Sequence, residues 1–113
     1  MEQETIEYLD TVACVARSNM VWQQRKAREE RSLDDAGAAL LMSCYLEIYD
    51  IWQSELAGEA PPPRIYVAAS SCVSMRRQLE QRPRVSWSDD EEGLFQMMTA
   101  FMFLFKHLYV AQH

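Results

Sequence analysis

The sequence predicts an all-α protein, a compact bundle of about four helices that ends in a very apolar C-terminal helix. The 113 residues include 3 glycines and 4 prolines, three of them adjacent at 61–63, so little interrupts long helices. Apolar residues also recur every three or four positions in four segments, about 4–31, 33–57, 64–81 and 89–111. The length and the 49% hydrophobic share indicate one globular domain over residues 1–113.

The first two segments each carry an apolar face with helical spacing. In 4–31, one stripe consists of Ile6, Leu9, Ala13, Ala16 and Met20, and a second stripe beside it consists of Tyr8, Val12, Val15 and Trp22. The segment continues as polar "QQRKAREER". Ser32 offers an N-cap to the second segment. The face expected there consists of Leu40, Leu41, Cys44, Ile48, Ile51, Trp52 and Leu56. Gly58 and the prolines at 61–63 end this helix.

The third segment leaves two interpretations open. A heptad seam favours a helix and consists of Ile65, Ala68, Cys72, Met75 and Leu79. The stretch "RIYVAASSCV" also contains residues typical of a strand. Because no partner strand is evident elsewhere, we expect a helix that Pro83 ends, followed by a loop or short extended piece in "RVSW".

The fourth segment opens with a Ser-x-x-Glu capping box at Ser88–Glu91 and then becomes very apolar. At 100° per residue, its expected core face holds Leu94, Phe95, Met97, Met98, Phe101, Met102, Leu104, Phe105, Leu108 and Tyr109. The remaining arc contains Ala100, and Phe103 and Val110 point nearly opposite the centre of the core face. Either another helix of this chain covers Phe103 and Val110, or a second chain does. The apolar run is also too short to span a membrane, and Lys106 and His107 interrupt it.

The charges are strongly segregated. Acids outnumber bases by 17 to 11, which gives a net charge of −6 and disfavours binding to nucleic acid or membranes. Between 32 and 63 there is no Lys or Arg, and Glu2, Glu4, Glu7 and Asp10 make an acidic start. We expect an acidic partner-binding face, although a merely solvated surface would show the same residues. Its members are Asp34, Asp35, Glu47, Asp50, Asp89, Asp90 and Glu91.

A second cluster is basic and contains Arg76, Arg77, Arg82, Arg84 and Trp87. Arginines beside an exposed aromatic ring could form a platform for single-stranded nucleic acid. The same arginines could instead pair with the acidic second helix or lie in solvent. The negative net charge makes this second interpretation the expected one.

No residue pattern indicates an enzyme, a metal or a cofactor, and we expect none. Cys14, Cys44 and Cys72 are far apart and sit on apolar helical faces, where cysteine is usually inert. A zinc site or a cysteine nucleophile would need these residues and His107 to converge in the fold. The odd cysteine count and the acidic N-terminus favour a reducing, cytoplasmic location.

In general character the chain is similar to the small inhibitors, adaptors and accessory proteins of bacteria and phages, including those that block CRISPR defence complexes. That similarity rests on size, charge and helix content, not on any motif. We therefore expect a non-enzymatic protein-binding module that occupies a basic or nucleic-acid-binding surface of a larger complex. It would use the acidic face or the aromatic side chains of Phe103 and Trp87. The alternative is a structural subunit that forms a homodimer through its last helix, where Phe103 and Val110 would be the interface.

Overall fold

The computed structural model describes the backbone of residues 2–30, 33–54 and 60–110, and the side chains of 2–19, 38–54 and 60–110. This part of the chain contains the α-helices α1 (Gln3–Glu30), α2 (Leu33–Gln53), α3 (Pro63–Glu80) and α4 (Asp89–Tyr109), and the 3₁₀ helix η1 (Arg84–Ser86). The described residues include no strand, so the all-α prediction is confirmed and the third segment is a helix. The expected caps and stops at Ser32 and Gly58 lie outside the described residues.

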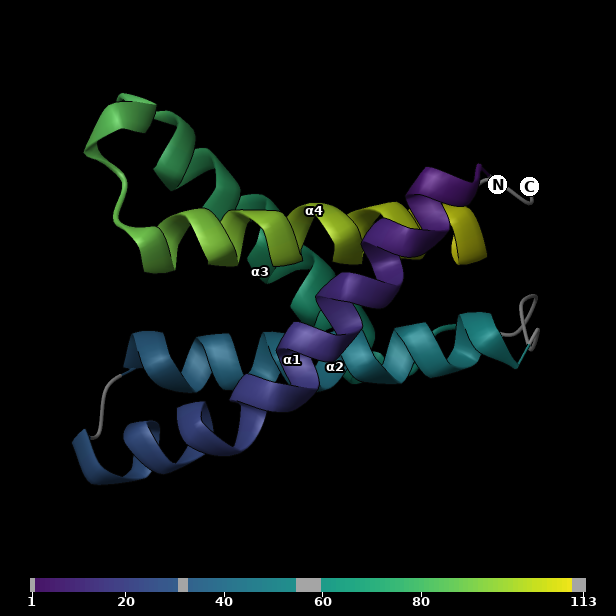
Figure 1. Ribbon diagram of the computed structural model, residues 1–113, viewed down its shortest axis with the longest axis horizontal. Helices are drawn as coiled ribbons and strands as arrows, with labels where there is room; N and C mark the ends of the chain where they lie inside the picture. The colour runs from purple at the N-terminus through teal and green to yellow at the C-terminus, as the bar shows by residue number, and fades with distance from the viewer. Residues whose placement is uncertain (1, 31–32, 55–59, 111–113) are drawn as a thin grey trace.

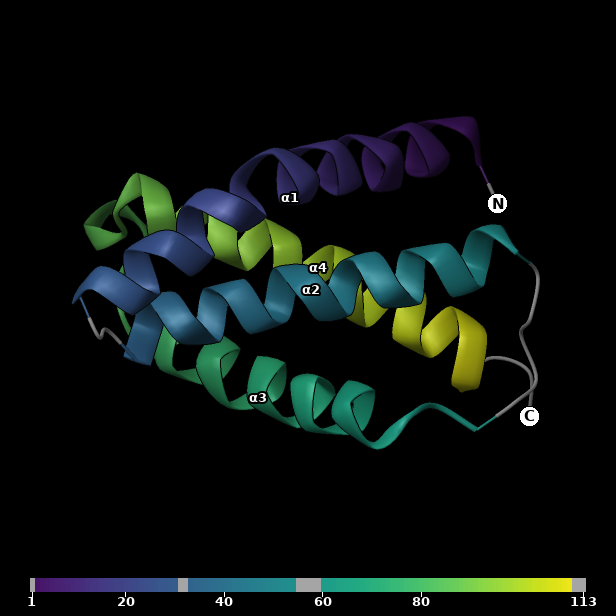
Figure 2. The same cartoon turned by 90° about the horizontal axis from the view of Figure 1, so that it is seen from below.

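The four helices alternate in direction along the chain, and α2 and α4 both begin at the same end of the molecule (Figure 1). Turned by 90°, the molecule has α1 and α3 on opposite sides, with α2 and α4 between them (Figure 2). This arrangement leaves α2 and α4 with neighbours on several sides. It leaves α1 and α3 each with a broad outward surface.

The chain itself explains how α3 and α4 begin. Pro63 is the first residue of α3, where a missing N–H costs nothing and the fixed φ suits a helix. At the start of α4, the Ser88 Oγ accepts a hydrogen bond from the Glu91 N–H at 3.1 Å. The Glu91 carboxylate accepts one from the Ser88 N–H, also at 3.1 Å, which completes the predicted capping box.

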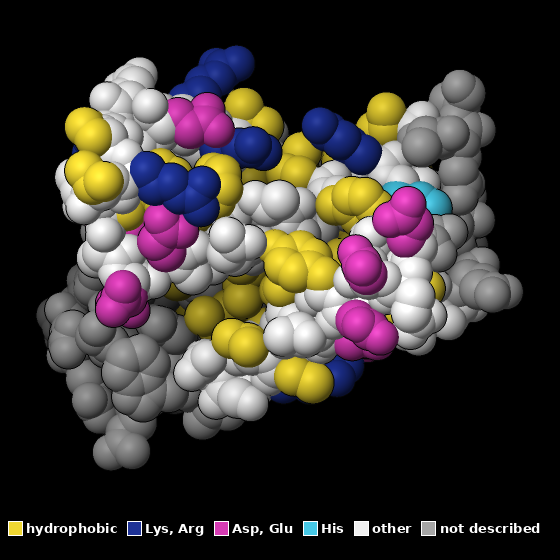
Figure 3. Space-filling view, turned by 45° about the horizontal axis from the view of Figure 1, so that its top comes forward, with side chains coloured by type: hydrophobic (Ala, Val, Ile, Leu, Met, Phe, Trp, Pro, Cys, Tyr) yellow, Lys and Arg dark blue, Asp and Glu magenta, His cyan; other side chains and the backbone are white. Residues whose placement is uncertain are grey.

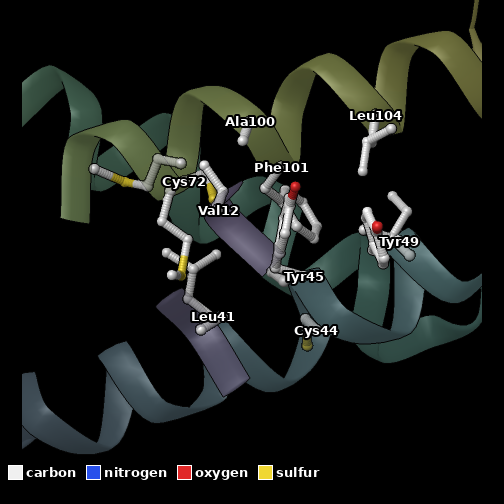
Figure 4. Packing of buried hydrophobic residues seen from close by; sticks show 14 of the residues in the cluster. Val12, Leu41, Cys44, Tyr45, Tyr49, Cys72, Ala100, Phe101 and Leu104 are labelled. Carbon is white, nitrogen blue, oxygen red and sulfur yellow. The ribbon is translucent and has the colours of Figure 1, made fainter. Parts of the chain in front are cut away.

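One hydrophobic core joins all four helices, and its largest wholly buried side chains are Tyr45 and Phe101. Tyr45 reaches from α2 toward α4 beside Phe101 (Figure 4). In α4 the buried residues are Met97, Met98, Ala100, Phe101, Leu104 and Leu108. The placement of Ala100 on the outer arc was therefore wrong, as was that of Leu40 on the core face, since Leu40 is 44% exposed. Small rotations of α2 and α4 about their axes decide these positions.

Candidate protein-binding surfaces

The members of the predicted acidic face whose side chains are described do not all lie together. Asp89, Asp90 and Glu91 lie in the first turn of α4, at the end of the molecule where α2 also begins (Figure 1). Glu47 lies fourteen residues after the first residue of α2, roughly 21 Å further along that helix axis. The side chains of Asp34 and Asp35 are outside the described residues. The acids of α2 and those of α4 therefore belong to different regions of the surface.

The two α2 acids with described side chains, Glu47 and Asp50, each have a basic neighbour. The Arg64 guanidinium lies 3.6 Å from the Glu47 carboxylate, and the Arg17 guanidinium lies 3.5 Å from Asp50. Arg64 also donates a 2.8 Å hydrogen bond to the Ser43 hydroxyl, which fixes it against α2. Exposed pairs at such distances are weak, because solvent screens them. Glu47 and Asp50 therefore keep much of their attraction for an outside cation.

The predicted basic cluster is largely neutralised, and its partners are the acids of the α4 cap. Arg82 donates two hydrogen bonds to the Glu91 carboxylate, at 2.6 and 3.1 Å. Arg84 binds Glu92 in the same two-pronged way, at 2.9 and 3.1 Å. Bidentate pairs of this kind are the strongest that arginine forms with carboxylates. We expected these arginines to pair with acids of the second helix. That expectation was wrong, because the partners of Arg82 and Arg84 are Glu91 and Glu92 of α4.

The same contacts shift the ionisation of the two glutamates. The hydrogen bonds from Arg82, and then that from the Ser88 N–H, lower the pKa of Glu91 to about 2. The hydrogen bonds from Arg84 likewise lower the pKa of Glu92 below its usual range. Both carboxylates are therefore ionised at neutral pH and hold their arginines in place. Within the basic cluster, Arg76 pairs with Glu80 at 3.0 Å, whereas Arg77 pairs with no described carboxylate.

Trp87 is half-buried, so the prediction of an exposed ring was wrong. Its indole N–H donates a 3.0 Å hydrogen bond to the backbone oxygen of Leu79. Its ring lies 5.1 Å from that of Phe95, and the Arg84 guanidinium lies 5.3 Å from the Trp87 ring centroid. The ring and the cation that would have stacked on a nucleobase are already in contact with each other. This cluster ties the end of α3 to the start of α4.

Negative charge without a described basic partner remains in two places. Glu2, Glu4 and Glu7 at the start of α1 are exposed, and no described Lys or Arg pairs with them. Asp89 and Asp90 are likewise exposed and unpaired within the described chain. The sequence shows the acidic start plainly, but the predicted acidic face did not include it. Counting acids does not reveal which of them the fold has already paired.

Several large apolar side chains are exposed on the outside of the bundle. Phe103 and Val110 are 43% and 55% exposed, so no described helix covers them. The Tyr8 ring of α1 is also partly exposed, and its hydroxyl donates a 3.0 Å hydrogen bond to the Gln96 backbone oxygen of α4. Figure 3 shows hydrophobic side chains over the middle of one face, with acidic side chains beside them.

The described side chains form no recognisable centre for chemistry. Cys44 and Cys72 are buried, and burial raises the pKa of both thiols, that of Cys72 to about 12. Cys14 is exposed, contrary to the expected apolar environment. No group of three described His, Cys, Asp or Glu residues could hold a metal ion. None of the helices, as far as they are described, has the length and apolar character needed to cross a membrane.

A groove between α2 and α3 has a volume of about 240 Å³ and is lined by Leu40, Leu41, Ala68, Ser71, Ser74 and Met75. It is smaller than the roughly 300–1,000 Å³ typical of ligand pockets and presents no charged side chain. No protein-family model, curated protein or solved structure matches this chain.

Proposed function

We propose that this protein is a non-enzymatic binding module, a small acidic inhibitor or adaptor that occupies a basic or nucleic-acid-binding surface of a larger protein. We place the protein in the cytoplasm, because its three cysteines are free thiols. The small size, acidic charge and helical character of the chain suit an accessory protein of a phage or bacterial defence system.

The distribution of unpaired charge is the observation that carries this proposal. The arginines of the basic cluster are mostly held by Glu80, Glu91 and Glu92, so they present little free positive charge. The carboxylates at the start of α1, together with Asp89 and Asp90, have no described basic partner. A surface of this kind attracts cationic partners over a distance and repels polyanions.

Affinity capture from the cells that make the protein tests this proposal. We expect a captured protein that is released by high salt and displaced by heparin, a polyanion that competes for basic surfaces. Charge reversal identifies the acids responsible, with Glu4→Lys/Glu7→Lys, Glu47→Lys/Asp50→Lys and Asp89→Lys/Asp90→Lys as three separate variants. Capture that resists salt, heparin and all three variants would contradict an acidic mode of binding.

The exposure of Phe103 and Val110 supports the alternative function, a structural subunit that pairs with a copy of itself through α4. Sedimentation velocity on the untagged protein separates the two proposals. A dimer that Phe103→Asp converts to a 13.2 kDa monomer would establish the subunit. A wild-type protein that sediments as a monomer would rule out the subunit that pairs with its own copy.

A further inference from the structure

The outer stripe of α4 combines apolar side chains with few charges. Gln96, Phe103 and Val110 follow one another at seven-residue intervals, which places each about 10.5 Å from the next along one side of the helix. The Phe103 ring lies parallel to the His107 ring, at 6.4 Å between centroids. The stripe thus presents an aromatic ring and a valine to the outside.

The N-terminal part of α1 adjoins this stripe at Gln96. The Tyr8 hydroxyl lies 3.0 Å from the Gln96 backbone oxygen and 2.9 Å from its side-chain Oε1. These contacts join the exposed Tyr8 ring to the row that continues through Phe103. We call the combined surface the α1–α4 face and define it by Glu4, Glu7, Tyr8, Phe103, Lys106 and Val110.

The rim of the α1–α4 face is acidic on its α1 side. Glu4 and Glu7 lie within one turn of Tyr8, and neither pairs with a described base. On the face shown in Figure 3, both acidic and basic side chains border the hydrophobic ones. Lys106 lies in the last turn of α4, where its charge offsets the negative end of the helix dipole. The face is therefore apolar in the middle, with two acids on its α1 side and one lysine on its α4 side.

This charge distribution decides between two occupants. A second copy would meet the first through the same patch and would bring the same two acids and one lysine, so both sides of the contact would carry a net negative charge. A cationic partner would gain attraction from the same carboxylates, and its apolar side could cover Tyr8 and Phe103. A helix of about 18 residues is roughly 27 Å long, enough to reach from Tyr8 to Val110 along this surface.

We propose that the α1–α4 face is the docking surface of this module, and that its occupant is a cationic amphipathic segment of another protein. This inference rests on the proposed function and specifies both the surface and the chemistry of the partner. Apolar anchors at the centre would provide most of the affinity, and the acidic rim would select a basic sequence.

Calorimetric titration with a designed peptide tests the proposal. The probe is an amphipathic helix of lysine and leucine about 18 residues long, and its control has glutamate in place of lysine. We compare Glu4→Gln/Glu7→Gln with Asp89→Asn/Asp90→Asn, because both double variants remove two unpaired acids near a helix start. Phe103→Ser is matched with Val67→Ser, which removes an exposed apolar side chain from α3.

We expect the lysine peptide to bind and the glutamate peptide not to bind. The Glu4/Glu7 variant and the Phe103 variant should each weaken binding roughly tenfold, while both controls stay near wild type. If both acid double variants weakened binding of the lysine peptide equally and Phe103→Ser had no effect, the peptide would not bind at the α1–α4 face. The protein would then still be an acidic binding module. Failure of the wild type to bind the lysine peptide would overturn this inference and count against the proposed function. A wild-type dimer that Phe103→Ser dissociates would assign the face to a second copy.

Discussion

The hydroxyl of Tyr45, a wholly buried side chain of α2, donates a 2.8 Å hydrogen bond to the backbone oxygen of Leu9 in α1. Burial of a phenol costs free energy unless its hydroxyl finds a partner, and this bond supplies one. The contact fixes the α1–α2 pair at one rotation, because a neighbouring carbonyl would lie on another side of α1. It joins the two helices within the hydrophobic core.

Replacement of Tyr45 by Phe should lower the free energy of unfolding by about 1 kcal/mol, because a buried hydrogen bond is lost while the ring remains. Urea denaturation measures the loss. Tyr66→Phe is the matched control, since Tyr66 is 53% exposed and its hydroxyl makes no described hydrogen bond. Similar losses in the two variants would show that the Tyr45 contact does not contribute to stability.

Ionisation of the Tyr49 hydroxyl should lower the free energy of unfolding in alkaline solution. Burial, and then the hydrogen bond to Asp10 at 2.5 Å, raise the pKa of Tyr49 from its usual 10.0 to about 12. A group whose pKa is raised by folding stabilises the protein fully below its unfolded pKa and loses that contribution as pH rises through the folded value. We expect stability to fall between about pH 10 and pH 12, measured by urea denaturation with tyrosinate absorbance recorded in parallel.

Tyr49→Phe should make this alkaline decline shallower, although Tyr45, whose pKa burial also raises, will still contribute. A wild-type protein with constant stability over that range would contradict the prediction. So would an identical decline in wild type and variant.

The three cysteines should differ sharply in reactivity. When the native protein reacts with Ellman's reagent, one equivalent of thionitrobenzoate should be released quickly, because the exposed Cys14 reacts first. Cys44 and Cys72 should react only after denaturation, because they are buried and burial raises the pKa of both thiols. Cys14→Ser should abolish the fast phase. Two or more fast equivalents in the native protein would mean that the core opens readily.

The helices were predictable because their signals are local. The Ser88–Glu91 box and the 3–4 spacing of the third segment, which includes Cys72, depend on residues within one or two turns. The contacts between elements were not predictable from one sequence. One example is the pair of Arg82 with Glu91, and another is the burial of Trp87 between α3 and α4. Both depend on how η1 turns the chain between these two helices. Sequence spacing shows which residues share a helix face, but not which neighbouring helix that face meets.

The pairing of Glu91 and Glu92 with arginines predicts that neutralising these two acids will create anion binding. Glu91→Gln/Glu92→Gln releases Arg82 and Arg84, and glutamine at the first position can still complete the capping box. Fluorescence anisotropy with labelled oligo-dT should show tighter binding than wild type. The slope of log K against log salt should steepen by about 1.4, since each of two new phosphate contacts contributes about 0.7.

Asp89→Asn/Asp90→Asn is the control for this experiment, because it makes the same change in net charge without releasing an arginine. We expect it to bind the oligonucleotide little better than wild type. If both double variants bound equally, the gain would come from net charge, and the bidentate pairs would not be what restrains the basic cluster. If neither bound, Arg82 and Arg84 would remain attached to the start of α4 even without their charged partners, held by contacts such as that between the Arg84 guanidinium and the Trp87 ring.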